Sequence, residues 1–250
     1  MVVNTDFIHL DVGGSSMRVF VATPRDDARY PGILCYSDIF QLTGPMLRAC
    51  TRLAGYGFVV AAPEIYHRLE PPGVAIPFDD AGRTRGMENA AKTAVADFDA
   101  DARATLDYLA GHPRVGAGQL AAMGFCIGGH LAFRAAMQPD VKATICFYGT
   151  GIHNGRLGRD ADAGSLHRAN EIRGSLLMVF GTQDPHIPEE GRAAIESVLR
   201  AAQVNHRFRL LPAEHAFMRD EGPRYDPEAT DLAFVEMIRA FREEWPPRNH

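Results

Sequence analysis

The sequence predicts an α/β fold, with a mainly parallel central sheet, an N-terminal antiparallel hairpin and helices on both faces. The main observation is an alternation of short apolar runs with segments of helical periodicity, which is typical of parallel sheets. The runs are apolar throughout, as in strands that are buried on both faces. Because the 250 residues contain neither a repeat nor a linker, we expect a single domain over residues 1–250.

The first part of the chain is expected to form the hairpin. Residues 6–12 and 17–22 are separated by Gly13 and Gly14, which tolerate the positive φ of a tight turn. The next elements expected, in chain order, are a strand over 33–36, a helix over 44–54, a strand over 58–62, an irregular Pro- and Gly-rich segment over 64–85 and a long helix over 90–110. Irregular segments of this length are often lids or binding elements.

The second part of the chain continues the alternation of strands and helices. We expect, in chain order, a strand over 119–123, a helix over 131–137, a strand over 143–148, an irregular stretch over 149–173, a strand over 176–180, a helix over 189–202, a strand over 207–211 and a final helix over 227–243. The parallel strands bring their carboxyl ends to one edge of the sheet, where ligands bind in open α/β folds.

Composition and charge exclude several classes of function. A net charge of -5 with interspersed signs argues against a nucleic-acid partner, which requires clustered positive charge. No apolar run approaches the roughly 18 residues of a membrane span, and residues 1–6 do not resemble a leader, so we expect no membrane partner and a cytoplasmic protein. No zinc-ligand spacing or phosphate-binding glycine loop is present, so we expect neither a metal nor another cofactor.

Cys126 has the most informative surroundings in the chain. It lies in Gly124-Phe125-Cys126-Ile127-Gly128, between an expected strand and an expected helix. Most cysteines are only small buried hydrophobic residues, and we expect that role for Cys35, Cys50 and Cys146. A Gly-x-Cys-x-Gly turn from strand to helix is instead typical of a nucleophile elbow, with a thiol in place of the usual hydroxyl. The N-terminus of the following helix favours negative charge on the sulfur.

Asp184 and His215 are the candidate partners of Cys126. Asp184 follows the strand over 176–180 and His215 follows the strand over 207–211. Taken alone, Asp184 could be only the cap of the following helix, and His215 could be only a solvent-exposed loop residue. Taken together, the three residues follow successive strands in the order nucleophile, acid, histidine, which is the order of a hydrolase triad on this kind of sheet.

With these residues in place, the chain resembles the dienelactone hydrolase family, whose members are α/β-hydrolases with a Cys-Asp-His triad. The resemblance covers nearly the whole chain and is carried by five short segments besides the triad order. These are Ser37-Asp38-Ile39-Phe40, Ala62-Pro63-Glu64-Ile65-Tyr66, Gly124-Phe125-Cys126-Ile127-Gly128-Gly129, Gly181-Thr182-Gln183-Asp184-Pro185 and His215-Ala216-Phe217. The segment that leads into the last helix, Tyr225-Asp226-Pro227, also resembles the family.

The resemblance implies further site residues. Asp38 stands where family members carry a glutamate that helps to generate the thiolate, and it is one methylene shorter. Two arginines hold a substrate carboxylate in the family; Arg219 fits one of them, and either Arg83 or Arg85 fits the other, with Arg83 preferred. The amides of Ile39 and Ile127 are the expected oxyanion-hole donors, since one lies in the third-strand loop and the other follows the nucleophile.

The expected function is hydrolysis of a small lactone or activated ester through a thioester of Cys126. An alternative is a promiscuous carboxylesterase or thioesterase, or a phosphotriesterase, on the same scaffold. An alternative from another class is a catalytically silent binding protein, since the fold alone does not prove activity. The oligomeric state stays open between monomer and homodimer.

Overall fold

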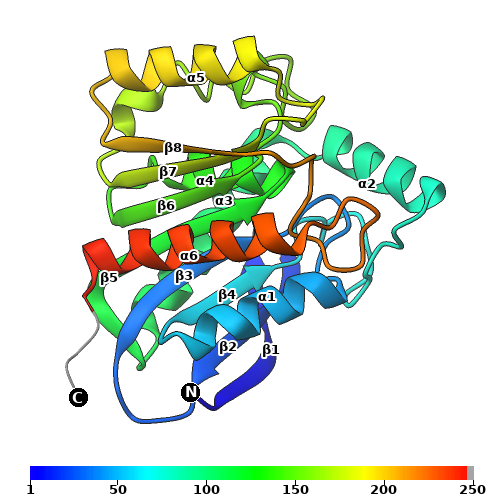
Figure 1. Ribbon diagram of the computed structural model, residues 1–250. Coiled ribbons are helices and arrows are strands. Elements are labelled where there is room, and N and C mark those ends of the chain that lie inside the picture. The colour runs from blue at the N-terminus through cyan, green and yellow to red at the C-terminus, as the bar shows by residue number, and fades with distance from the viewer. Residues whose placement is uncertain (247–250) are drawn as a thin grey trace.

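The computed structural model describes residues 1–246, which form an eight-stranded sheet (Figure 1). The strand order is β1-β2-β4-β3-β5-β6-β7-β8; β2 pairs with β1 and β4 in the antiparallel sense, and the other pairs are parallel. The strands are β1 (Val3–Val12), β2 (Ser15–Pro24), β3 (Tyr30–Tyr36), β4 (Val59–Pro63), β5 (Val115–Phe125), β6 (Val141–Phe147), β7 (Ser175–Gly181) and β8 (His206–Leu211). This confirms the mainly parallel sheet with its N-terminal hairpin.

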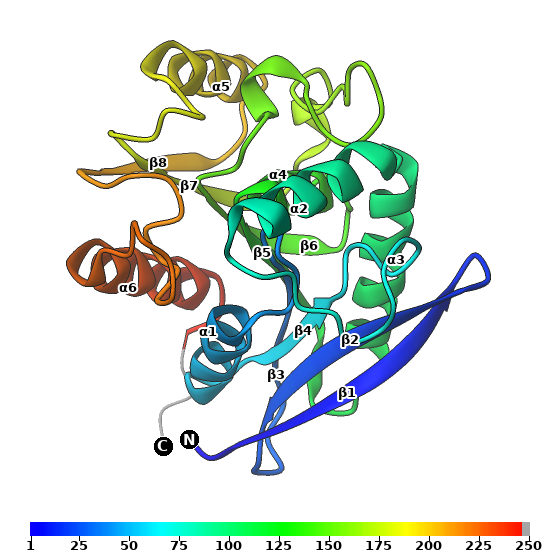
Figure 2. The same ribbon diagram turned by 90° about the vertical axis from the view of Figure 1, so that its right-hand side faces the viewer.

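Helices cover both faces of the sheet. Helices α1 and α6 lie on one face, and α3 and α4 lie on the other (Figures 1 and 2). The helices are α1 (Gly44–Gly55), α2 (Asp80–Lys92), α3 (Val95–Gly111), α4 (Ile127–Ala135), α5 (Glu189–Ala201) and α6 (Pro227–Glu244), with short 3₁₀ turns at Ile152–Asn154 and Ala169–Glu171. No helix within residues 1–246 is long and apolar enough to cross a membrane.

The region after β4 differs from the sequence-based expectation. One long helix over 90–110 was expected after an irregular segment, whereas two helices, α2 and α3, meet at an extended Thr93 with φ -86° and ψ 131°. Asp79 caps α2 by accepting a hydrogen bond from the Gly82 amide at 2.7 Å. The buried residues of α2 are Gly82, Gly86 and Asn89. Because none of them has a large apolar side chain, hydrophobic periodicity does not predict this helix from the sequence.

Helix α4 also begins earlier than expected. It starts at Ile127, directly after Cys126, and ends at Ala135, whereas the sequence suggested residues 131–137. The sequence pattern missed the first turn because Gly128 and Gly129 are poor helix formers. All nine residues of α4 are buried, so the packing of the helix against β5, β6 and α3 offsets their low propensity.

The apolar strands form the core as expected. Cys35, Cys50 and Cys146 are free thiols with at most 1% of their surface exposed, which confirms that they are packing residues. The carboxyl ends of β3, β5, β7 and β8 lie along the same edge of the sheet. The loops that leave this edge carry the predicted site residues.

Candidate active site

Cys126 sits on a sharply strained turn at the end of β5. Its backbone has φ 58° and ψ -122°, a region that residues with side chains rarely adopt. A Cβ on Gly124 would lie 2.0 Å from the Gly128 carbonyl oxygen, and a Cβ on Gly128 would lie 2.2 Å from the Ser37 carbonyl oxygen. The turn therefore requires both glycines, and it presents the Cys126 side chain at the N-terminus of α4.

Asp184 and His215 are joined in a buried hydrogen bond. The Nδ1 of His215 lies 2.7 Å from Oδ2 of Asp184, and both side chains are less than one-tenth exposed. The other carboxylate oxygen, Oδ1, accepts a hydrogen bond from the His186 amide at 2.8 Å. The rings of Tyr148 and His186 pack edge-on against the His215 ring, at centroid distances of 5.1 and 4.7 Å. These contacts fix the orientation of the imidazole.

The same imidazole interacts with Cys126. Burial lowers the pKa of His215, but charge interactions and hydrogen bonds with Cys126 and Asp184 outweigh it and raise the pKa to about 9. The structure thus brings Cys126, His215 and Asp184 together, as the sequence suggested. A thiol, an imidazole and a carboxylate are the kinds of group that nucleophilic catalysis uses.

Asp38 and Arg219 bind each other. Oδ2 of Asp38 accepts hydrogen bonds from Nε of Arg219 at 3.0 Å and from Nη2 at 2.6 Å. Oδ1 of Asp38 accepts a hydrogen bond from the Phe40 amide at 2.9 Å. The guanidinium also lies 4.7 Å from the ring centroid of Phe40 and 4.8 Å from that of Phe78. Nothing in the sequence pairs these two residues, because 181 positions separate them.

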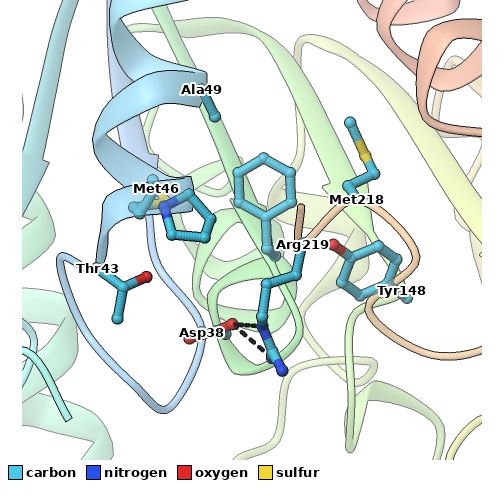
Figure 3. Close-up of a pocket in the computed structure, with 9 residues that line it drawn as sticks. Asp38, Thr43, Met46, Ala49, Tyr148, Met218 and Arg219 are labelled. Atoms are coloured by element: carbon cyan, nitrogen blue, oxygen red, sulfur yellow. Dashed lines mark hydrogen bonds and ion pairs between the residues drawn. The ribbon is translucent and has the colours of Figure 1, made fainter. Parts of the chain in front are cut away.

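The ion pair borders a small pocket beside the nucleophile elbow (Figure 3). The pocket is small, with a cavity volume of about 30 Å³. Its apolar lining includes Phe125 and Tyr148 next to the elbow, Met46 and Ala49 from α1, and Met218 from the loop after β8. The side chains of Asp38 and Arg219 close one end of it, so their movement would change the shape of the pocket.

The two arginine candidates on α2 have different partners. Arg85 forms an ion pair with Glu70, which also accepts a hydrogen bond from Asn89. Arg83 is 63% exposed and makes a looser contact of 3.6 Å with Asp80. Its positive charge makes the smallest contribution to lowering the pKa of His186, after burial and the charges of His215 and Arg224. Arg83 is therefore the less constrained of the two arginines.

The candidate oxyanion donors lie on either side of the elbow. Ile127 is the first residue of α4, and the amides of a first helical turn lack partners within the helix. Ile39 follows Asp38 in the loop after β3. A Cβ on Gly86 would lie 2.4 Å from the carbonyl oxygen of Ile39, so α2 packs directly onto this loop. Helix α2, which the sequence did not reveal, thus supports the loop.

Sequence reasoning missed several side chains around the triad. Tyr66, Tyr148 and His186 each follow the carboxyl end of a strand, which is the signal that could have identified them. Within residues 1–246, no group of three or more His, Cys, Asp or Glu side chains is placed to hold a metal ion.

Comparisons with known proteins agree with this architecture. The model of the dienelactone hydrolase family matches residues 17–245. The putative carboxymethylenebutenolidase of Saccharomyces cerevisiae is 37% identical over 216 residues, which cover 83% of this chain and 79% of the yeast protein. A further relative, the carboxymethylenebutenolidase of Pseudomonas sp. (strain P51), is 29% identical over 219 residues, 86% of each chain.

Solved structures share the fold at lower identity. A putative dienelactone hydrolase from Klebsiella pneumoniae superposes with a TM-score of 0.81 at 23% identity, over 97% of this chain and 100% of that chain. A dienelactone hydrolase-like promiscuous phosphotriesterase from metagenomic libraries gives 0.78 at 22% identity, over 96% and 98%. Since the family model spans most of the sequence and the yeast relative matches over most of both chains, this chain belongs to the dienelactone hydrolase family and is a hydrolase with the α/β-hydrolase fold.

Proposed function

We propose that the protein hydrolyses a lactone or activated ester through a thioester formed on Cys126, with His215 and Asp184 completing the triad. The observation that carries the proposal is the buried 2.7 Å hydrogen bond between Asp184 and His215, on an imidazole that also interacts with Cys126. The strained backbone of Cys126 supports it, because such strain concentrates at functional sites.

The reaction begins with the Cys126 sulfur as thiolate and His215 as imidazolium. The sulfur attacks the carbonyl carbon, and the amides of Ile127 and Ile39 donate to the resulting oxyanion. When the intermediate collapses, the carbon–oxygen bond breaks and His215 gives its proton to the leaving oxygen. In a lactone the leaving oxygen stays tethered to the acyl group.

Hydrolysis of the thioester restores the enzyme. His215, now neutral, takes a proton from a water molecule as the water attacks the thioester carbonyl. The carbon–sulfur bond then breaks, releasing a carboxylic acid and the thiolate, and the imidazole keeps the proton. Asp184 orients the ring throughout and stabilises its charged form.

The Asp38–Arg219 pair supports a substrate that carries a free carboxylate. A carboxylate on the substrate would compete with Asp38 for the Arg219 guanidinium, which is only 15% exposed and therefore weakly screened. Asp38, released from Arg219, would then accept the thiol proton of Cys126 and pass it to His215, which leaves the thiolate and imidazolium with which the reaction begins. Arg83 is the second candidate for binding the substrate carboxylate.

The test is the Cys126→Ala variant, assayed against an enol-lactone, an aryl ester, a thioester and a phosphotriester. We expect kcat/KM for the preferred substrate to fall at least about a thousandfold, as for other triad nucleophiles. The Cys50→Ala variant, changed at a buried thiol of α1 outside the site, is the matched control and should keep its activity. Full activity in Cys126→Ala would contradict the proposal, and the substrate that turns over fastest separates a lactonase from a general esterase or a phosphotriesterase.

A further inference from the structure

Helix α6 carries a row of solvent-exposed side chains along most of its length. Its buried side, which includes Ala233, Met237 and Phe241, packs on β6 and β7, so the opposite side faces outward (Figure 1). The exposed residues recur three or four positions apart, a spacing that places them along one stripe of the helix surface. The residues of this α6 stripe are Glu228, Asp231, Leu232, Val235, Arg239 and Arg242.

The middle of the α6 stripe is apolar. Val235 is 55% exposed, and Leu232 beside it is also exposed. The exposed ring of Tyr56, directly after α1, lies 5.6 Å from the ring centroid of Phe234 and extends the apolar surface toward α1. An open groove with a cavity volume of about 440 Å³ runs along this side of α6, and its lining includes Tyr56, Val235 and Ile238. Apolar surface that continues from one helix to the next is typical of a protein interface.

The two ends of the α6 stripe carry opposite charges. Asp231 lies four positions before Val235, and Arg239 lies four positions after it. Glu228 lies seven positions before Val235, and Arg242 lies seven positions after it. The acidic and basic side chains are therefore placed symmetrically about Val235, with opposite sign.

A stripe of this kind is complementary to a second copy of itself. In a twofold-symmetric pair of antiparallel helices centred on Val235, each residue faces the one that lies equally far on the other side of the centre. Asp231 then faces Arg239 of the partner subunit, and Glu228 faces Arg242 of the partner subunit. The apolar centres of the two stripes meet at the symmetry axis. A parallel pairing would instead bring like charges together.

The contacts that these charges make within one chain are weak. Asp231 lies 3.5 Å from Arg52, and Arg239 lies 3.5 Å from Glu236. The side chains of Asp231 and Arg239 are both exposed, so solvent screens these pairs and they contribute little to stability. Both side chains can therefore turn toward a second molecule at little cost.

We propose that the α6 stripe is a homodimer interface, in which α6 packs antiparallel against α6 of a second copy of this chain. Burial of the apolar centre drives the association, and the charges on either side of it fix the direction and register of the two helices. Because one pair of helices buries less surface than a standard interface, we expect a dissociation constant in the micromolar range. The inference does not depend on which residue is the nucleophile.

The first experiment is sedimentation velocity of the full chain at concentrations that span the micromolar range. We expect the mass to rise from the 27.4 kDa of one chain toward twice that value as the concentration increases. Val235→Lys places two positive charges at the symmetry axis and should raise the dissociation constant at least about tenfold. Met87→Lys is the matched control, because Met87 is a similarly exposed apolar residue on α2, and it should leave the association unchanged.

A charge-reversal experiment tests the antiparallel register. Arg239→Glu and Asp231→Arg each bring like charges together in a homodimer, so each variant alone should dimerise at least about tenfold more weakly than wild type. When the two variants are mixed, opposite charges face each other again at both positions. The mixture should therefore form a heterodimer at least about tenfold more stable than either variant homodimer. Circular dichroism melting curves check that each variant is folded.

A wild-type chain that stays monomeric across this range would overturn the inference, and the α6 stripe would then serve another partner or none. A dimer that Val235→Lys leaves intact would also overturn it, since the interface would lie elsewhere. A dimer weakened by Val235→Lys whose two charge variants do not prefer each other would contradict the antiparallel pairing.

Discussion

Arg219 is held in place by several interactions at once. Its guanidinium forms two hydrogen bonds to one oxygen of Asp38 and lies over the rings of Phe40 and Phe78. Both charges are about 85% shielded from solvent, so the pair is stronger than a surface salt bridge. Under the proposed function, a substrate carboxylate would replace this interaction with one of similar strength.

Replacing Arg219 with Gln should therefore reduce activity toward substrates that carry a free carboxylate more than activity toward neutral substrates. We expect kcat/KM for an ester bearing a free carboxylate to fall at least about tenfold, the loss of one charge-assisted hydrogen bond. The value for a neutral aryl ester should change by less than about threefold, because a neutral substrate offers no charge for the guanidinium to bind. Steady-state kinetics with the two substrates measure the difference, and Arg209→Gln on the exposed side of β8 is the control. An equal loss for both substrates would show that Arg219 acts only through packing.

At the scale of elements, helix α4 connects the nucleophile to the segment over 149–173. His130 lies within the first turns of α4 and is fully buried. Its Nδ1 lies 2.9 Å from the Thr150 carbonyl oxygen, and its Nε2 lies 2.7 Å from the Ser165 hydroxyl. Arg134, at the other end of the helix, donates to the same hydroxyl at 3.1 Å. These contacts anchor an irregular segment that has little regular secondary structure of its own.

This anchoring predicts a loss of stability in acid. Burial, together with the charges of Arg134 and His153, lowers the pKa of His130 to about 3, against the raising effect of its hydrogen bond to Thr150. The unfolded chain binds a proton at about pH 6.5, so the stability is complete above that pH and declines as the pH falls from there toward 3. We expect His130 to contribute a loss of about 2 kcal/mol in the free energy of unfolding between pH 7 and pH 5.

Urea unfolding of wild type and His130→Asn at both pH values measures this contribution. The variant should be less stable at pH 7 but should lose about 2 kcal/mol less than wild type on going to pH 5. Equal pH dependence in the two proteins would show that His130 is not responsible.

At the scale of the whole molecule, the sequence predicts the sheet and the triad for the same reason. Continuous apolar runs identify buried strands, and in a parallel sheet the residues after those runs must meet at one edge. Cys126, Asp184 and His215 could be placed in this way because each lies within four residues of the end of a strand. The assignment of residues 1–250 to one domain stays a prediction.

Other parts could not be read from the sequence, because they depend on contacts between distant segments. Helix α2 buries glycines and an asparagine rather than an apolar stripe, so periodicity does not reveal it. Asp38 and Arg219 were predicted separately, as an activating group and a substrate-binding group, but their mutual pairing is a tertiary contact. The Tyr66 hydroxyl lacks a hydrogen-bond partner within the described residues, and this becomes apparent only when its surroundings are known.

The most direct test of the mechanism is to identify the acylated residue. The protein is mixed rapidly with an activated aryl ester, quenched in acid during turnover and analysed by intact mass and peptide mapping. We expect a mass increase equal to one acyl group, located on the peptide that contains Cys126 and removed by hydroxylamine. Steady turnover with that peptide unmodified, or with the acyl group on another residue, would contradict the assignment of Cys126 as the nucleophile.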